Sequence, residues 1–126
     1  MKIEIEYNRK IEDVQSDFNN AFQYLRIEFL QINYELYKQQ GVQANKFVKP
    51  GFTMGDLNKN ITDCFIEIPN ALTVYELEKT FMNKLGLKVR VLRKSGNIWM
   101  ETNMTGNWTL SQQNEHGREI SNSRAS

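Results

Sequence analysis

Two side chains offer the groups of a thiol-dependent catalytic pair, because Cys64 and His116 are the only cysteine and histidine of the chain. Such a pair needs the thiol and the imidazole within hydrogen-bond reach and a third group that orients the imidazole. The two residues belong to different predicted elements, and no residue nearby is suited to orient the histidine. One cysteine and one histidine are also too few for a structural zinc site. We therefore expect a structural cysteine, a surface histidine near a helix C-terminus, and no catalytic residue, metal or cofactor.

Three glutamates, Glu4, Glu6 and Glu67, fall on the same face of two predicted strands. A cluster of carboxylates suits metal binding or acid–base catalysis. Lys88 and Arg90 of another predicted strand favour a simpler role, because they would pair with these carboxylates across a solvated sheet face. Exposed ion pairs of this kind contribute only about 0–1 kcal/mol each. An enzyme or small-ligand sensor that uses this face is the third and least favoured hypothesis.

Basic residues gather at the end of the predicted helix that starts at Val74 and in the strand that follows it. They are Lys84, Lys88, Arg90, Arg93 and Lys94, with Trp99 nearby. Positive charge beside an aromatic ring is typical of proteins that bind single-stranded nucleic acid. RNA-binding sheets place aromatic rings on their central strands, where this chain would have glutamates that repel phosphate. The net charge of +1 adds no general attraction, so nucleic-acid binding is the alternative function.

The two tryptophans, Trp99 and Trp108, allow two interpretations. In the first, Trp99 lies beside Leu92 under a C-terminal helix, and Trp108 is the hydrophobic staple of that helix. In the second, the tryptophans belong to an exposed patch with the composition of an interaction hot spot. The candidate interaction surface consists of Arg90, Leu92, Arg93, Lys94, Trp99, Glu101 and Trp108.

The stretch from residue 73 to residue 102 positions most of these side chains. Thr73 and Glu76 have the spacing of a capping box, apolar residues then recur at helical spacing, and Gly86 suits the left-handed position that ends a helix. An alternating strand, a turn at Ser95-Gly96 and a second strand follow. This turn would pair Lys94 with Asn97, Leu92 with Trp99, and Arg90 with Glu101.

Both halves of the chain show the order strand, helix, strand. A shift of 63 residues places Ile3, Ile5, Ile11, Val14, Phe18 and Phe22 on Ile66, Ile68, Val74, Leu77, Phe81 and Leu85. With a hairpin strand and a short helix at the C-terminus, the order βαβ…βαββα predicts an α+β fold with a ferredoxin-like split βαβ repeat. Right-handed crossovers put both helices on one face of a single sheet with strand order 5-4-1-3-2.

A long insert, residues 31–60, separates the two halves. The pattern predicts that the preceding strand extends to Leu36, that residues 37–51 form a loop, and that residues 53–58 form a short helical turn. A connection of this length is more often functional or mobile than a plain turn.

The C-terminal part repeats the helix-start signal. Thr109 and Gln112 have the capping-box spacing, so we expect a short helix over residues 110–116. Gly117 is expected to end this helix. A disordered tail over residues 121–126 is expected to follow.

The composition is that of an ordinary globular protein, with 126 residues, 40% of them hydrophobic and 25% charged. We expect a single domain over residues 1–120. The first residues, MKIEIEYNRK, contain no apolar signal segment, and no apolar run approaches the roughly 20 residues of a membrane span. One cysteine cannot form an internal disulfide, which fits a cytoplasmic location.

The sequence also resembles a known family over about two thirds of its length. LTVYELEKTF, followed by LGLKVRVLRKSGNIWMETNMTGNWTLSQQNEHG, is similar to the pattern TV-x-ELE-x-x-F, FGL-x-V-x-V-RKSGN-x-W-x-ET and WTL-x-x-QN of a family of small Bacteroidetes proteins. Leu85 stands where that family has an aromatic residue, and the segments KIEIE and YLRIEF are similar as well. The family has no assigned activity, so the resemblance implies origin and fold and no mechanism.

No phosphate-binding loop, dinucleotide fingerprint, nucleophile elbow or HExxH helix occurs in the sequence. A compact predicted core, the lack of a catalytic constellation and two sheet edges that need covering favour a small non-enzymatic protein-interaction module. The expected partner is another protein or a second copy of the chain, and no membrane is expected.

Overall fold

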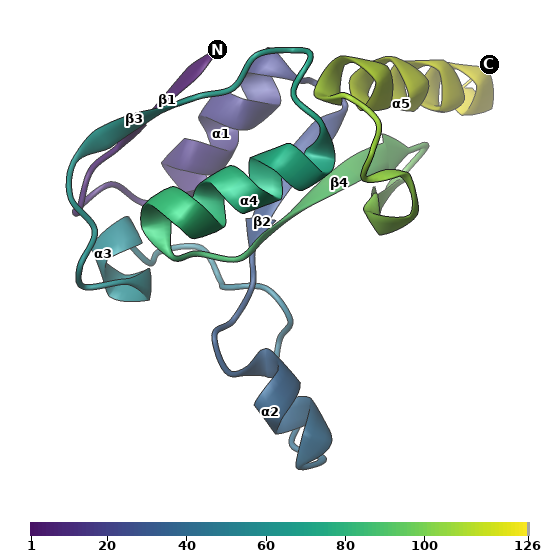
Figure 1. Cartoon of the computed structure of the whole chain (residues 1–126). Coiled ribbons are helices and arrows are strands. Elements are labelled where there is room, and N and C mark those ends of the chain that lie inside the picture. Colours follow the sequence, from purple (N-terminus) through teal and green to yellow (C-terminus); the bar gives the residue numbers. More distant parts are fainter. Residues whose placement is uncertain (126) are drawn as a thin grey trace.

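The computed structural model describes residues 1–125, in which five strands and five α-helices occur (Figure 1). The strands are β1 (Lys2–Ile5), β2 (Leu25–Phe29), β3 (Cys64–Glu67), β4 (Val89–Ser95) and β5 (Ile98–Glu101). The helices are α1 (Ile11–Ala21), α2 (Tyr34–Gln39), α3 (Met54–Leu57), α4 (Val74–Leu85) and α5 (Leu110–Ala125), with a 3₁₀ turn η1 at Asn103–Thr105. Within residues 1–125, none of the helices has the length and apolar character that a membrane-crossing segment requires.

The two predicted strand–helix–strand halves are present as β1–α1–β2 and β3–α4–β4. Every apolar residue that the repeat aligns lies in one buried core, to which both halves contribute. Phe29 of the first half and Phe81 of the second meet edge to face in this core, with ring centroids 6.0 Å apart. The mixed α+β class is therefore confirmed.

The pairing of the strands differs from the predicted order 5-4-1-3-2. β1 pairs with β3, whereas β2, β4 and β5 form a separate three-stranded sheet with β4 in its centre, and all pairs are antiparallel. The expected neighbours β1–β3 and β4–β5 are present, but β4 lies beside β2 and not beside β1. The single five-stranded sheet of the ferredoxin-like prediction is therefore not formed.

Side chains of α1 close the outer edge of β2, where the predicted order places β3. The amide of Gln15 donates to the carbonyl of Ile27 at 2.8 Å, and the amide of Asn19 donates to the carbonyl of Leu25 at 2.8 Å. A further strand at this edge would need the same carbonyls. The predicted order is wrong because the strand pattern does not reveal these side-chain bonds.

The helix starts follow the predicted capping chemistry. Thr73 Oγ1 accepts from the Glu76 backbone at 3.1 Å, and the Glu76 carboxylate accepts from the Thr73 backbone at 3.0 Å. α4 ends at Gly86, whose φ of 64° is in the left-handed region that favours glycine. The same boxes start α3, from Thr53 and Asp56, and α5, from Thr109 and Gln112.

β4 and β5 form the predicted hairpin, but the turn is Gly96-Asn97 and not Ser95-Gly96. The reason is the first turn position, which needs positive φ in this kind of two-residue hairpin and is occupied by Gly96 with φ 67°. Each partner moves by two residues, so the strand faces stay as predicted. The observed pairs are Ser95 with Ile98, Lys94 with Trp99, Arg93 with Met100, and Leu92 with Glu101.

α5 is longer than predicted, since it continues through Gly117 to Ala125 and includes most of the expected tail. Ser126 lies outside the described residues. Gly117 does not end the helix but lets it approach the sheet, because a Cβ there would lie 2.9 Å from Tyr24 Cβ and 3.0 Å from Arg93 Cγ. Close packing and helix termination use the same residue type, which is why the prediction fails here.

The insert contains a helix where an extended strand and a loop are predicted. β4 begins at Val89, directly opposite Phe29, so an extension of β2 past Leu30 would have no partner strand. Leu30 instead forms an isolated bridge with Phe47 on the returning chain. The segment between them, residues 31–46, projects from the body and includes α2 (Figure 1).

Candidate interaction surface

The structure divides the predicted interaction residues between the two sides of the three-stranded sheet. The side turned away from the core, here called the open face, holds Arg90, Leu92, Lys94, Trp99 and Glu101. Arg93 lies on the core side, where its guanidinium is 6.0 Å from the ring centre of Trp108. Strand alternation explains this division, because neighbouring residues of β4 point to opposite sides. The predicted surface is therefore two separate clusters.

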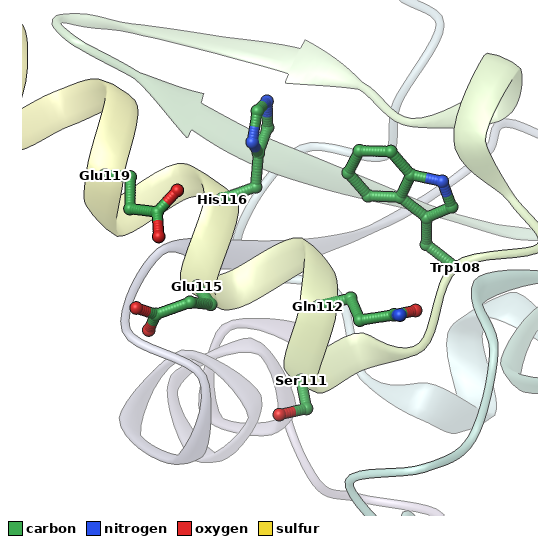
Figure 2. A pocket seen from close by; sticks show the side chains of 6 residues that line it. All are labelled: Trp108, Ser111, Gln112, Glu115, His116 and Glu119. Carbon is green, nitrogen blue, oxygen red and sulfur yellow. The ribbon is translucent and has the colours of Figure 1, made fainter.

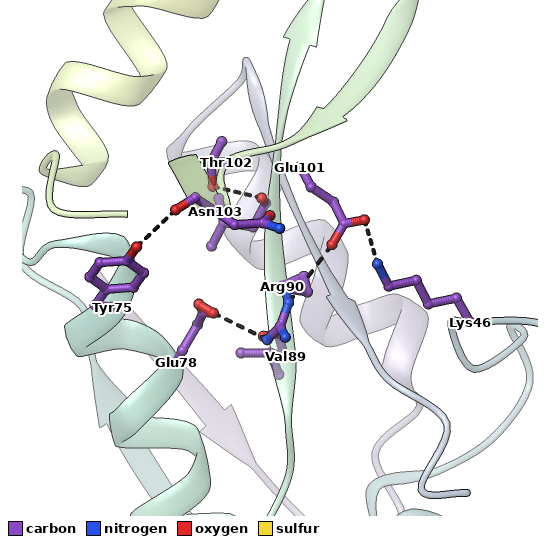
Figure 3. Close-up of polar contacts among 9 residues, drawn as sticks. Lys46, Tyr75, Glu78, Val89, Arg90, Glu101, Thr102 and Asn103 are labelled. Atoms are coloured by element: carbon purple, nitrogen blue, oxygen red, sulfur yellow. Dashed lines mark hydrogen bonds and ion pairs between the residues drawn. The ribbon is translucent and has the colours of Figure 1, made fainter. Parts of the chain in front are cut away.

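Arg90 is the centre of a charge network on the open face (Figure 3). Its Nη1 lies 3.2 Å from Glu78 Oε1 on α4, and its Nε lies 3.7 Å from Glu101 Oε1 on β5. The second oxygen of Glu101 accepts from Lys46 Nζ at 2.6 Å. Burial raises the pKa of Glu78 above its ordinary value, and the charge of Arg90 opposes this shift. Two cations balance two carboxylates here, so this part of the predicted basic ridge is not a positive patch.

Trp99 is half-buried on the open face and does not lie under α5. The guanidinium of Arg26 lies 5.4 Å from the centre of its ring, within the range of a cation–π contact. Arg26 also pairs with Glu28 at 2.7 Å, and faces Leu92, which is 8% exposed. The predicted packing of Trp99 under the C-terminal helix is wrong, because α5 packs on the opposite side of β4. Trp99, Leu92 and Arg26 lie together on the open face, where Trp99 and Arg26 are the more exposed of the three.

Trp108 belongs to the second cluster, at the start of α5. Its ring meets that of His116 edge to face, with centroids 5.4 Å apart (Figure 2). The fully buried Gln113 accepts a hydrogen bond from Arg93 Nη1 at 2.7 Å. Burial lowers the pKa of Arg93 below its ordinary value. These contacts attach the first turns of α5 to the sheet, which is a structural role for Trp108.

A shallow depression of about 450 Å³ borders this cluster along the exposed side of α5 (Figure 2). Arg118 donates to the carboxylate of Glu115 in its wall and lowers the pKa of that carboxyl. The depression is open to solvent and does not enclose a reacting group. It is lined by Trp108, Ser111, Gln112, Glu115, His116 and Glu119.

The structure does not bring the only thiol and the only imidazole together. Cys64 lies on β3 and pairs with Ile5, whereas His116 lies on α5 against Trp108. Figure 1 shows β3 and α5 at opposite ends of the molecule. Within residues 1–125, no group of three or more His, Cys, Asp and Glu residues is placed to hold a metal ion.

The three glutamates predicted on one open sheet face lie at the two-stranded sheet. Lys2 Nζ lies 3.9 Å from Glu67 Oε1. Glu4 raises the pKa of Glu6 through a hydrogen bond and through its negative charge. The predicted cross-strand pair with Arg90 is not formed, because β4 belongs to the other sheet. The proposed ligand face with Glu4, Glu67 and Arg90 is therefore divided as well.

The segment of residues 31–46, here called the arm, is the surface feature that the sequence pattern did not reveal. None of its residues is buried, and Figure 1 shows it projecting from the body. Apolar side chains on it face solvent: Ile32 is 76% exposed, Leu36 is 49% exposed and Val42 is 52% exposed. The arm therefore leaves apolar surface in contact with water.

Backbone hydrogen bonds give the arm a defined shape. At its base, the Gln31 N–H donates to the Lys46 carbonyl at 2.9 Å. At its tip, residues 34–42, the Val42 N–H donates to the Tyr37 carbonyl at 2.9 Å around Gly41, whose φ is 70°. This is the Schellman motif that ends a helix, so Gly41 is the signal from which α2 could have been predicted.

The arm is also poor in charge. Of residues 31–46 only Glu35, Lys38 and Lys46 are charged, a smaller share than the 25% of the whole chain. Solvated protein surfaces hold roughly 25–35% charged residues, whereas the centres of interfaces are depleted of them. The arm is thus exposed and holds a smaller share of charged residues than the whole chain.

No protein-family model, curated protein or solved structure matches the chain. The surface chemistry of the arm and of the open face is thus what indicates a function.

Proposed function

We propose that the chain is a small protein-interaction module that binds its partner through the arm. The observation behind this proposal is an ordered projection that exposes apolar side chains and has few charges. Short helices are stabilised mainly by packing of an apolar face, yet α2 has no buried residue in the chain alone. A partner that covers Ile32, Leu36 and Val42 would supply this packing, at about 25 cal/mol per Å² of apolar surface removed from water.

The open face adjoins the arm and extends the proposed contact surface. The ion pair between Lys46 and Glu101 attaches the base of the arm to β5. Arg26 and Glu28 of β2 share a depression of about 370 Å³ with Lys46 and its neighbours on the returning chain. Tryptophan and arginine are enriched in hot spots, so Trp99 and Arg26 are suited to contact the same partner.

A photo-crosslinking amino acid at position 36 tests the proposal in cells that express the protein naturally. We expect a crosslinked product from position 36 and none from position 104, where Met104 is 97% exposed in η1. The matched control separates specific contact from mere exposure. A lack of any product from position 36, or equal products from both positions, would exclude the arm as the binding element.

Nucleic-acid binding through residues 84–94 is the alternative proposal. Lys84 and Lys88 are exposed and support it, whereas Arg90 and Arg93 already contact protein groups. Binding to single-stranded RNA or DNA would weaken steeply with salt and decrease in a Lys84→Gln/Lys88→Gln variant. An absence of binding at low salt would remove this alternative.

A further inference from the structure

We infer that the partner of the arm is a second copy of the same chain, an inference that rests on the function proposed above. In this dimer the tip of each arm lies in an apolar groove at the base of the other arm. The groove has a volume of about 190 Å³. Its walls include Leu30, Ile32, Leu57, Met82, Leu87 and Lys88.

The arrangement of tip and groove is self-complementary. Ile32, at the base of the arm, lines the groove, whereas Leu36, Tyr37 and Val42 are exposed at the tip. In a dimer with two-fold symmetry the same patch of both copies meets itself in reverse. Two arms that run antiparallel across the symmetry axis therefore place each tip at the base of the other arm, and both contacts form at once.

The chemistry of the two surfaces also matches. Met82 is 44% exposed at the groove, so apolar surface is available on both sides of the contact. Lys88 lines the groove, and Glu35 precedes Leu36 at the tip, which gives opposite charges where tip and groove meet. Within the arm Glu35 and Lys38 cancel and Lys46 pairs with Glu101 of the body, so two antiparallel arms do not repel each other.

The arm and the groove together reach the lower end of the size that a stable dimer needs. A standard interface takes roughly 20–30 residues from each partner. The arm and the groove together contribute just over 20 residues per copy. The outer edge of β5 is a weaker candidate for self-association, because that strand has only four residues to form backbone bonds with a second copy.

Sedimentation equilibrium of the purified protein over a wide concentration range tests this inference. We expect a dimer whose dissociation constant rises at least tenfold in Leu36→Gln and in Met82→Gln. Met104→Gln exchanges an equally apolar side chain that is 97% exposed outside both surfaces, and it should leave the dimer unchanged. Circular dichroism shows whether each variant keeps its helices.

Mixing the two variants distinguishes a reciprocal contact from any other. A mixed dimer of Leu36→Gln and Met82→Gln chains retains one tip and one groove that are both native, so the mixture should associate more tightly than either variant alone. The inference would be overturned if neither substitution changed the dissociation constant of the dimer, or if the mixture of variants associated no more tightly than each variant alone.

The result also separates this inference from the proposed function. If the wild-type chain stays monomeric at high concentration while position 36 crosslinks to a different protein, the proposed interaction function stands and the inference of a second copy as partner is excluded. A monomer without any crosslink from position 36 would remove both.

Discussion

Replacing Gln113 with leucine tests how α5 is attached to the sheet. Gln113 is fully buried, and its Oε1 accepts from Arg93 Nη1 at 2.7 Å. Its Nε2 donates to the carbonyl of Thr105 at 2.8 Å and to the hydroxyl of Thr105 at 2.7 Å. Leucine has a similar size but no polar atom, so the substitution removes these bonds without leaving a large cavity.

The expected loss follows from the kind of bonds that are removed. The bond from the charged guanidinium contributes about 1.5–3 kcal/mol, and each neutral bond contributes about 0.5–1.5 kcal/mol. Burial of the leucine side chain recovers about 1–2 kcal/mol. The Nε of Arg93 is already buried without a hydrogen-bond partner, so the substitution takes the Gln113 bond from a guanidinium that is not fully paired even in the wild-type chain. We therefore expect the free energy of unfolding to fall by about 3 kcal/mol, and the melting temperature to fall by roughly 10 °C.

Urea titration of Gln113→Leu and of Gln112→Leu measures this effect against a matched control. Gln112 undergoes the same exchange one position earlier, where it loses only one exposed capping bond from the Thr109 N–H. That loss should stay near 1 kcal/mol or below it. A double-mutant cycle with Arg93→Met should give a coupling energy of about 1–2 kcal/mol. A change within about 0.5 kcal/mol for Gln113→Leu, or equal losses for both glutamines, would refute the reasoning.

Three further substitutions test local predictions. Gly86→Ala should lower the free energy of unfolding by about 1 kcal/mol or more in denaturant titrations, because φ 64° strains any residue with a Cβ; an unchanged midpoint would contradict this. Thr73→Ala should cost about 1 kcal/mol near neutral pH. The Thr73 backbone N–H and, to a smaller extent, its hydroxyl lower the pKa of Glu76, and alanine removes only the hydroxyl. The part of the loss that comes from the hydroxyl acting on this carboxylate should therefore shrink as the pH falls through the lowered pKa, and an unchanged loss in acid would contradict this. Arg90→Met should raise the pKa of Glu78 further in an NMR titration, because the substitution removes the larger of the two opposing positive charges and leaves only that of Lys88 against desolvation and the charge of Glu101; a fall would contradict the network.

The parts of the fold that were predicted correctly depend on neighbours in sequence. Thr73, Glu76 and Gly86 determine both ends of α4 through bonds within a few residues, so the pattern alone predicts that helix. The core positions were also predicted, because the periodicity of strands and helices shows which side chains share a face. These features need no knowledge of what lies on the other side of the chain.

The parts that were predicted wrongly depend on contacts between distant segments. The outer edge of β2 is bonded by Gln15 and Asn19, two ordinary polar residues, and not by the strand that the predicted order places there. Gly117 has the sequence signature of a helix end but serves a close approach to Tyr24. The arm is not predicted because residues 31–36 have the alternation of a strand and residues 37–46 have the polar composition of a loop, and only Gly41 indicates the helix.

The strand β4 links this comparison to the proposed function. Its alternation is regular at Val89, Arg90 and Val91, and then an apolar residue, Leu92, points to the open face while a charged residue, Arg93, points to the core side. Both exceptions have a neighbour: the buried Gln113 of α5 accepts a hydrogen bond from the half-buried Arg93, and Leu92 lies diagonally across the strand pair from Trp99. A change of phase within one strand therefore locates two features at once. It marks where α5 is attached to the core, and it marks the apolar part of the open face, where the largely buried Leu92 lies near the half-buried Trp99.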